Sequence, residues 1–389
     1  MLPNTNPDSS INWRYANAAH IAAGLQSLRA QTLAMFDAYL AANQLTVPCS
    51  DELNPPLWEL GHIGWFQEHW IGRNQQRHLG IRYDAEQTRL PSLLAESDSF
   101  YDSSHVPHAT RWDLPLPDAK ACKSYLTATL QQTLNWLQLA GESDNALYFY
   151  RLVLFHEAMH LEAATYMAQT LNTPIAIKSI AVKALKTKAI AKLISKNNDF
   201  LMGSLDAGFV FDNELGAHSV SIAAFEIDQR CVSWRDYLNF VEATHRHLPR
   251  YVRRTAQGYE KLVFGLWEAI DFQAPAVHVN LVEAQDYCAW AGRRLPTEAE
   301  WELAASTLNP DEFHWGEVWE WTATVFAPYS GFVAHPYQDY SEPWFGSRQV
   351  LRGACVATQP MMRNAKYRNY FAADRTDIFA GFRTCAISG

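Results

Sequence analysis

Apolar residues recur at helical spacing through the first part of the chain, and this pattern predicts four long helices. Their ranges are 17–40, 57–73, 119–139 and 144–171. Pro55 and Pro56 stand at the start of the second range, where a first helical turn tolerates proline. Four helices of this length favour an up-and-down bundle. The irregular stretch 80–117 between them is long, and such connections are uncommon unless they are functional.

The pattern changes after residue 171. From about residue 199 the chain consists of short β-like runs separated by Gly, Pro, Asn and Trp, with helices predicted at 281–291 and 297–306. Thr297, followed three residues later by Glu300, gives the last of these a capping box. Residues 163–198 contain lysines but no acidic residue. We interpret this stretch as a solvated connection between two domains rather than as a basic contact surface.

Composition restricts the classes of protein to consider. Of the 389 residues, 48% are hydrophobic and 19% are charged, which is enough to build two sizeable cores. The net charge of −9 gives no support for nucleic-acid binding. No apolar stretch approaches the roughly 18 residues needed to span a bilayer. The polar start lacks the layout of a signal peptide, so we expect a cytoplasmic protein without a membrane partner.

The six cysteines are scattered, with no C-x-x-C pair. This spacing argues against a zinc knuckle and fits reduced thiols.

The strongest candidate for chemistry is a pair of histidines, His156 and His160, in the fourth predicted helix. Side chains four residues apart share one face of a helix, so both imidazoles can reach one metal ion. With Glu157 the pair also matches the H-E-x-x-H motif of zinc peptidases. Such peptidases need a further ligand downstream, yet no Glu or His occurs between Glu162 and Glu214. The peptidase interpretation is therefore disfavoured.

His62 is the best candidate for a third ligand. It stands within an apolar run of the second predicted helix, and facing helices of a bundle commonly supply metal ligands together. Three imidazoles leave open positions on the metal, which suits ferrous iron with O2 as well as hydrolytic zinc. Glu162 is a candidate fourth ligand or an acceptor for an imidazole N–H. Spacing alone does not separate these alternatives.

Several motifs together resemble a known family, the ergothioneine-type sulfoxide synthases. In the first half they are residues 54–62 and the series His156, His160 and Glu162. In the second half they are residues 291–302, 318–322, 350–353 and 380–383. The resemblance implies an α+β chain in which a DinB-like four-helix bundle precedes a C-type-lectin-like domain of the formylglycine-generating-enzyme type. We place the bundle at 1–175, a linker at 176–198 and the second domain at 199–389.

The resemblance also implies an activity. These enzymes hold a non-heme Fe(2+) with three histidines, here His62, His156 and His160, and use O2 to join a chalcogen donor to the imidazole of a histidine derivative. Tyr337, in the segment 336–341, occupies the place of the family's catalytic tyrosine. Its phenol, protonated at neutral pH, would supply a proton, or a proton and an electron.

The chain departs from the family pattern where the donor is held. Arg111 matches one of two arginines that bind donor carboxylates, but His108 replaces the other, and Phe371 replaces an aspartate. Loss of a fixed cation and a fixed anion weakens the grip on a zwitterionic donor.

Residues 58–68, 101–104 and 147–152 look most like the selenoneine synthase branch of the family, which uses hercynine, O2 and a neutral selenosugar, 1-seleno-β-D-glucose. A neutral sugar is consistent with the lost charges. On the hercynine side, Asn369 and Tyr370 correspond to positions near its carboxylate, and Met159 replaces a glutamine near its imidazole. Tyr370 and Phe371 are candidates for an aromatic wall facing its quaternary ammonium. A thiol donor with the same chemistry is the alternative. A lectin-like binding protein with a structural metal, or with none, is a rival of another class.

Overall fold

The computed structural model describes residues 11–175, 191–194 and 198–387. The chain divides into two compact units. The first contains Met1–Ala176, Asp206–Val210 and Gln359–Met362, and the second contains Ile177–Leu205, Phe211–Thr358 and Arg363–Gly389. Among the described residues, no helix is both long and apolar enough to cross a membrane.

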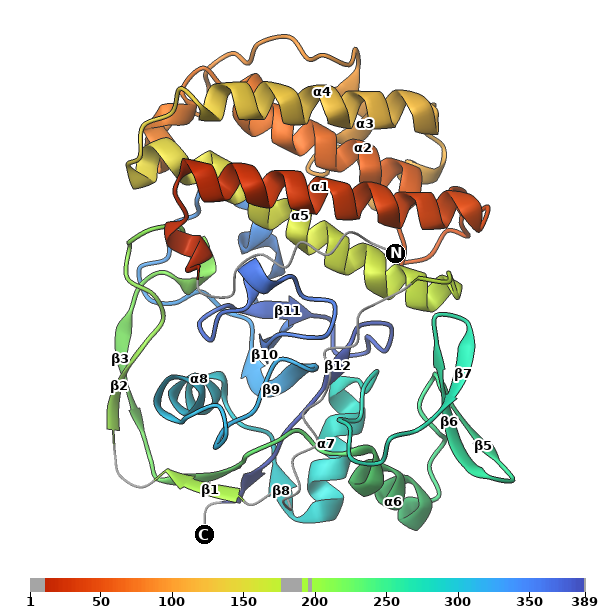
Figure 1. Cartoon of the computed structure of the whole chain (residues 1–389). Coiled ribbons are helices and arrows are strands. Elements are labelled where there is room, and N and C mark those ends of the chain that lie inside the picture. The colour runs from red at the N-terminus through yellow and green to blue at the C-terminus, as the bar shows by residue number, and fades with distance from the viewer. Residues whose placement is uncertain (1–10, 176–190, 195–197, 388–389) are drawn as a thin grey trace. The chain divides into compact units, whose positions relative to one another are not determined.

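Four long helices build the first unit and lie side by side in Figure 1, as predicted. They are α1 (Ala18–Ala41), α2 (Pro56–Gln67), α4 (Ala119–Leu137) and α5 (Asp144–Leu171). A π-helical segment, η2 (Glu68–Gly72), extends α2. The remaining described helices of this unit are short: η1 (Trp13–Tyr15), η3 (Arg77–Arg82), α3 (Ser97–Tyr101), η4 (His108–Trp112) and η8 (Pro360–Met362).

Local sequence explains where the long helices begin. The side chains of Asn17, Asp118 and Ser143 accept hydrogen bonds from the first-turn backbone of α1, α4 and α5. These caps satisfy N–H groups that have no partner inside the helix. Pro56 opens α2, where its missing N–H costs no helical hydrogen bond.

Among its described residues, the second unit contains two four-stranded sheets and two smaller ones. The first sheet has the order β1-β4-β13-β8, and the second has β11-β10-β9-β12. Their bounds are β1 (Ala191–Ile194), β4 (Phe225–Asp228), β8 (Arg293–Arg294), β9 (Trp319–Val325), β10 (Gln349–Gly353), β11 (Asn369–Phe371), β12 (Ala380–Gly381) and β13 (Cys385–Ala386). The smaller sheets are β2 (Asn198–Met202) with β3 (His218–Ile222), and β5 (Val252–Thr255), β6 (Gly258–Val263) and β7 (Leu266–Ala269).

Three α-helices accompany these sheets in the described part of the unit: α6 (Trp234–Thr244), α7 (Leu281–Ala291) and α8 (Glu298–Thr307). The short helices are η5 (Asp212–Glu214), η6 (Gln338–Tyr340) and η7 (Glu342–Trp344). The helices at α7 and α8 match the predicted ranges, and the Thr297 capping box is present. Helix α6 was not expected. Its Trp, Tyr, Phe and Val content favours strands, but its apolar residues follow a helical period and Ser233 caps it.

The proposed linker is only partly described. Residues 176–190 and 195–197 lie outside the described residues. Within the linker range, β1 pairs antiparallel with β4, and so joins a sheet of the second unit.

Buried ion pairs explain the charged motifs of the second unit. Glu302 and Glu320 are fully buried, as are their partners Arg352 and Arg383. A buried carboxylate is tolerated when a hydrogen-bonded cation compensates its charge. These motif residues therefore hold strands and α8 together. The same holds for Glu298, which binds Arg368.

Candidate metal centre

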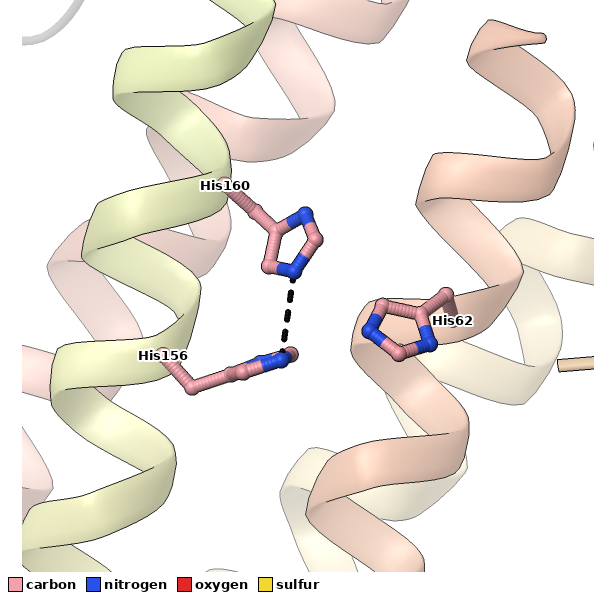
Figure 2. A group of neighbouring side chains, drawn as sticks. All are labelled: His62, His156 and His160. Atoms are coloured by element: carbon pink, nitrogen blue, oxygen red, sulfur yellow. Dashed lines mark hydrogen bonds between the residues drawn. The ribbon is translucent and has the colours of Figure 1, made fainter. Parts of the chain in front are cut away.

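Three histidines of the first unit converge on one point. Figure 2 shows His62 projecting from α2 toward His156 and His160 on α5. The Nε2 atoms of His156 and His160 are 3.1 Å apart, and candidate ligand atoms of all three lie within 4.8 Å of one another. Within the described part of the chain, this is the one group of three or more His, Cys, Asp or Glu side chains arranged to hold a metal ion.

Hydrogen bonds fix two of the rings. His62 donates from Nδ1 to the carbonyl oxygen of Tyr101 at 2.8 Å, and His160 donates from Nδ1 to Glu59 at 2.5 Å. A proton on Nδ1 leaves the lone pair on Nε2, the atom that faces the cluster. Such acceptors orient metal-binding histidines and make them better ligands.

Burial keeps two of the imidazoles neutral, and aromatic rings pack against both of them. Trp58 stacks on His62 with centroids 4.7 Å apart, and Phe66 stacks on His156 at 3.5 Å. Burial, followed by the neighbouring His160, lowers the pKa of His62 to about 3 and that of His156 well below its usual value. Converging imidazoles, of which burial holds His62 and His156 neutral, match what a divalent transition metal requires, so the residues fit such an ion.

Gly61 makes room for this arrangement. A Cβ atom at this position would lie 2.1 Å from the ring of Tyr101. Tyr101 could then not pack against α2, and its carbonyl could not hold His62. The glycine in the 54–62 motif is thus explained by close approach.

Glu59 is the functional residue that the sequence analysis missed, since Glu162 was named there instead. Glu162 is buried but does not belong to the ligand group. Burial alone would raise the pKa of Glu59, but His160, His62 and Arg111 lower it to about 2, so it is a carboxylate. Its position three residues before His62, on the same helical face, was the available signal.

Replacing Glu59 by glutamine should weaken metal binding by about 10–100-fold, because His160 loses its charged acceptor. Titration of the metal-free protein with Fe(II) or Co(II) measures this loss. Glu68→Gln is the matched control. Glu68 is equally buried in the same continuous helix, but it binds Ser92, Leu93 and Tyr125. Equal metal affinity in the two variants would contradict the role given to Glu59.

Glu157 points away from the histidines. Both of its oxygens bind Arg29, at 2.9 and 3.0 Å, and one also accepts from Thr32 at 2.9 Å. Arg29 and Glu157 are both buried. A zinc peptidase would need this carboxylate at the metal-bound water. The expected orientation of Glu157, off the metal face, is confirmed. The glutamate of the H-E-x-x-H motif is explained by its buried ion pair with Arg29.

Glu157→Ala should reduce the free energy of unfolding by about 3–5 kcal/mol, because it leaves Arg29 buried without a counter-ion. Denaturant unfolding measures the loss. The double variant Arg29→Met with Glu157→Leu should recover most of it, since an apolar pair can replace a buried ion pair. Metal bound per folded molecule should not change in either variant. Loss of metal from folded Glu157→Ala would place Glu157 in the site after all.

The predicted donor residues lie on η4. His108 contacts the carbonyl oxygen of Leu53 through Nε2 at 2.8 Å. Arg111 donates to the side-chain oxygen of Asn54 at 2.9 Å, and its guanidinium lies 3.8 Å from the centroid of the Trp58 ring.

Arg111 is thereby linked to the histidines in two ways. Asn54 donates to Glu59 at 2.6 Å, and Glu59 accepts from His160. Trp58 stacks on His62. Met159, which stands between the two α5 histidines in the chain, is half-buried.

The remaining predicted residues lie in the second unit. Half-buried Tyr337 precedes the short helix η6 (Gln338–Tyr340), and its ring is 5.6 Å from that of Tyr340. Tyr370, on β11, donates to the carbonyl of Tyr340 and stacks on Phe326 at 4.0 Å. Tyr337, Tyr340 and Tyr370 therefore form one aromatic cluster.

The two neighbours of Tyr370 in the chain have contacts of their own. Asn369 turns its side-chain oxygen to the backbone N–H of Tyr370 at 2.9 Å. Phe371 was a candidate to face the quaternary ammonium of hercynine. In the structure its ring lies 5.3 Å from the guanidinium of Arg375, so a cation of the protein itself lies beside it.

Comparison with known proteins adds a family and several relatives. Residues 186–317 and 313–387 match the sulfatase-modifying factor enzyme 1-like domain (FGE-sulfatase). The hercynine oxygenase of Mycobacterium tuberculosis is 29% identical, with 93% of this chain and 97% of that protein covered. The hercynine oxygenase of Mycolicibacterium smegmatis is 28% identical, with 85% of this chain and 90% of that protein covered. The formylglycine-generating enzyme of Streptomyces coelicolor is 30% identical over 40% of this chain and 75% of that protein.

Proposed function

This chain belongs to the sulfatase-modifying factor enzyme 1-like domain family, and we propose that it joins a chalcogen donor to the imidazole ring of hercynine, using O2 and a three-histidine iron site. It is an enzyme of oxidative chemistry, as are the hercynine oxygenases that match most of its length. The convergence of three imidazoles in the first unit is the observation that carries the proposal. The helical unit would be the DinB-like bundle of the sulfoxide synthases.

His62, His156 and His160 would hold the iron, which supplies the capacity to activate O2 when it is bound. Three protein ligands leave coordination positions for O2 and substrate. Glu59 and the Tyr101 carbonyl would keep two of the rings in the tautomer that presents Nε2. Trp58 and Phe66 would exclude water from one side of the centre.

Tyr337 would be the catalytic residue of the second unit. Its phenol would deliver a proton, or a proton and an electron, in the oxygen-dependent step. Asn369 and Tyr370 would bind hercynine, together with Met159 near its imidazole. Phe371 would stand where a charged donor is otherwise held.

The relatives favour a reaction with a thiol donor, such as cysteine or γ-glutamylcysteine. The hercynine oxygenases align with nearly the whole chain, and a further relative is named for ergothioneine biosynthesis. We therefore take carbon–sulfur bond formation as the first candidate reaction.

A neutral selenosugar is the second candidate donor. It is favoured by the donor segment itself, where His108 stands in place of an arginine and Arg111 is engaged by Asn54 and Trp58. A donor without carboxylates would not need to displace these contacts.

A donor competition tests both candidates. Iron-loaded protein is mixed anaerobically with hercynine and equal amounts of cysteine, γ-glutamylcysteine and 1-seleno-β-D-glucose, and is then exposed to air. Mass spectrometry of the products identifies the donor. A sulfur adduct alone supports the first candidate, and a selenium adduct alone supports the second. Absence of any hercynine adduct, with zinc bound instead of iron, would support a lectin-like binding protein.

A further inference from the structure

A small cavity lies in the first unit beside the metal centre. Its volume is about 30 Å³, and side chains of α1, α2 and α5 line it. The wall is mainly apolar and includes Met35, Phe36, Leu60, Ile63, Leu161 and Met167. The ring of His160 and the carboxylate of Glu59 complete the lining.

The polar groups on this wall already have partners. Thr32 donates to Glu157 at 2.9 Å, and the hydroxyl of Tyr39 donates to the carbonyl of Ala164 at 2.5 Å. Glu59 accepts from Asn54 and from His160. A buried water needs two to four polar partners, and apolar cavities stay dry and bind apolar guests such as xenon. The apolar part of the wall can therefore accept a small apolar molecule, and Glu59 marks the end of the cavity where water would bind.

We propose that this cavity is a holding site for dioxygen next to His160. It has room for a diatomic molecule but not for a substituted imidazole or a sugar, so it is not a subsite for either organic substrate. The inference rests on the proposed function, since that reaction consumes O2. O2 held against the apolar wall would be concentrated beside a metal ligand.

Paramagnetic relaxation measures O2 occupancy directly. The metal-free protein is placed under O2 pressure, and the relaxation rates of its methyl protons are compared with those under nitrogen. The methyls of Ile63 and Leu161 should relax several-fold faster, whereas those of Leu25 and Leu28, which are fully buried elsewhere in the same unit, should change little. Equal enhancement at the four residues would overturn the proposal.

Filling the cavity provides the second arm. Ala164→Phe places a ring in the space. Ala163→Phe is the matched control, because Ala163 precedes Ala164 on α5 and is similarly half-buried but does not line the cavity. Ala164→Phe should remove the extra relaxation at Ile63 and raise the KM for O2 several-fold while leaving the KM for hercynine unchanged. Ala164→Leu serves if the larger ring prevents folding. Wild-type values in both Ala164 variants would overturn the proposal.

The relaxation arm needs no metal and no turnover, so its failure can be distinguished from failure of the proposed function. Selective relaxation at Ile63 and Leu161 without a hercynine product under any condition supports the O2 site and contradicts the reaction. A hercynine product without selective relaxation supports the reaction and contradicts the O2 site.

Discussion

Replacement of His156 by alanine is expected to abolish iron binding and the O2-dependent activity together. The two remaining imidazoles, His62 and His160, sit on different helices and would hold a metal only weakly. The ring of Phe66, which now stacks on His156 at 3.5 Å, would also lose its partner and open a gap beside the site. Metal analysis after iron loading and an oxygen electrode measure the two losses.

His69→Ala is the matched control for this variant. His69 lies on η2, directly after α2, and packs against Trp65 at 4.9 Å without belonging to the ligand group. It should retain iron and hercynine-dependent O2 consumption. Circular dichroism of both variants separates loss of metal from loss of fold. A folded His156→Ala protein with full iron content would show that the metal is held elsewhere.

Tyr337→Phe should slow product formation by about 10²–10⁴-fold, the range that a positioned proton donor contributes. The change removes one hydroxyl and keeps the ring that contacts Tyr340. Iron content and the KM for hercynine should therefore remain at wild-type values. Single-turnover kinetics with hercynine and the preferred donor measure the slowed step.

Tyr340→Phe provides the comparison within the same aromatic cluster. Its hydroxyl pairs with that of Tyr367 at 2.9 Å, and its side chain is buried, so its loss should lower stability more than rate. If Tyr337→Phe turned over at the wild-type rate while Tyr340→Phe did not, the catalytic role would have been assigned to the wrong tyrosine.

The sequence predicted the parts of this molecule that depend on local rules. The period of apolar residues placed the long helices to within a few residues, and the capping box at Thr297 was predicted correctly. The four-residue spacing of His156 and His160 on a helix is enough to place both rings on one face. Helix α6 was missed because its residue types favour strands although their spacing is helical.

Contacts between distant residues were beyond the same reasoning. Glu59 and His160 are separated by 101 positions, and His62 and the Tyr101 carbonyl by 39. No local pattern announces such a pair, so Glu162, which is nearer in the chain, was named in place of Glu59. Arg29 likewise pairs with Glu157 across 128 positions, and the H-E-x-x-H spelling gives no sign of this contact.

Hercynine-dependent O2 consumption by the iron-loaded protein tests the central claim most directly. The account predicts that an oxygen electrode records uptake when hercynine and a chalcogen donor are both present, that uptake matches the amount of hercynine adduct formed, and that it disappears in His156→Ala. Equal uptake with and without hercynine, or none with any of the three donors, would contradict it.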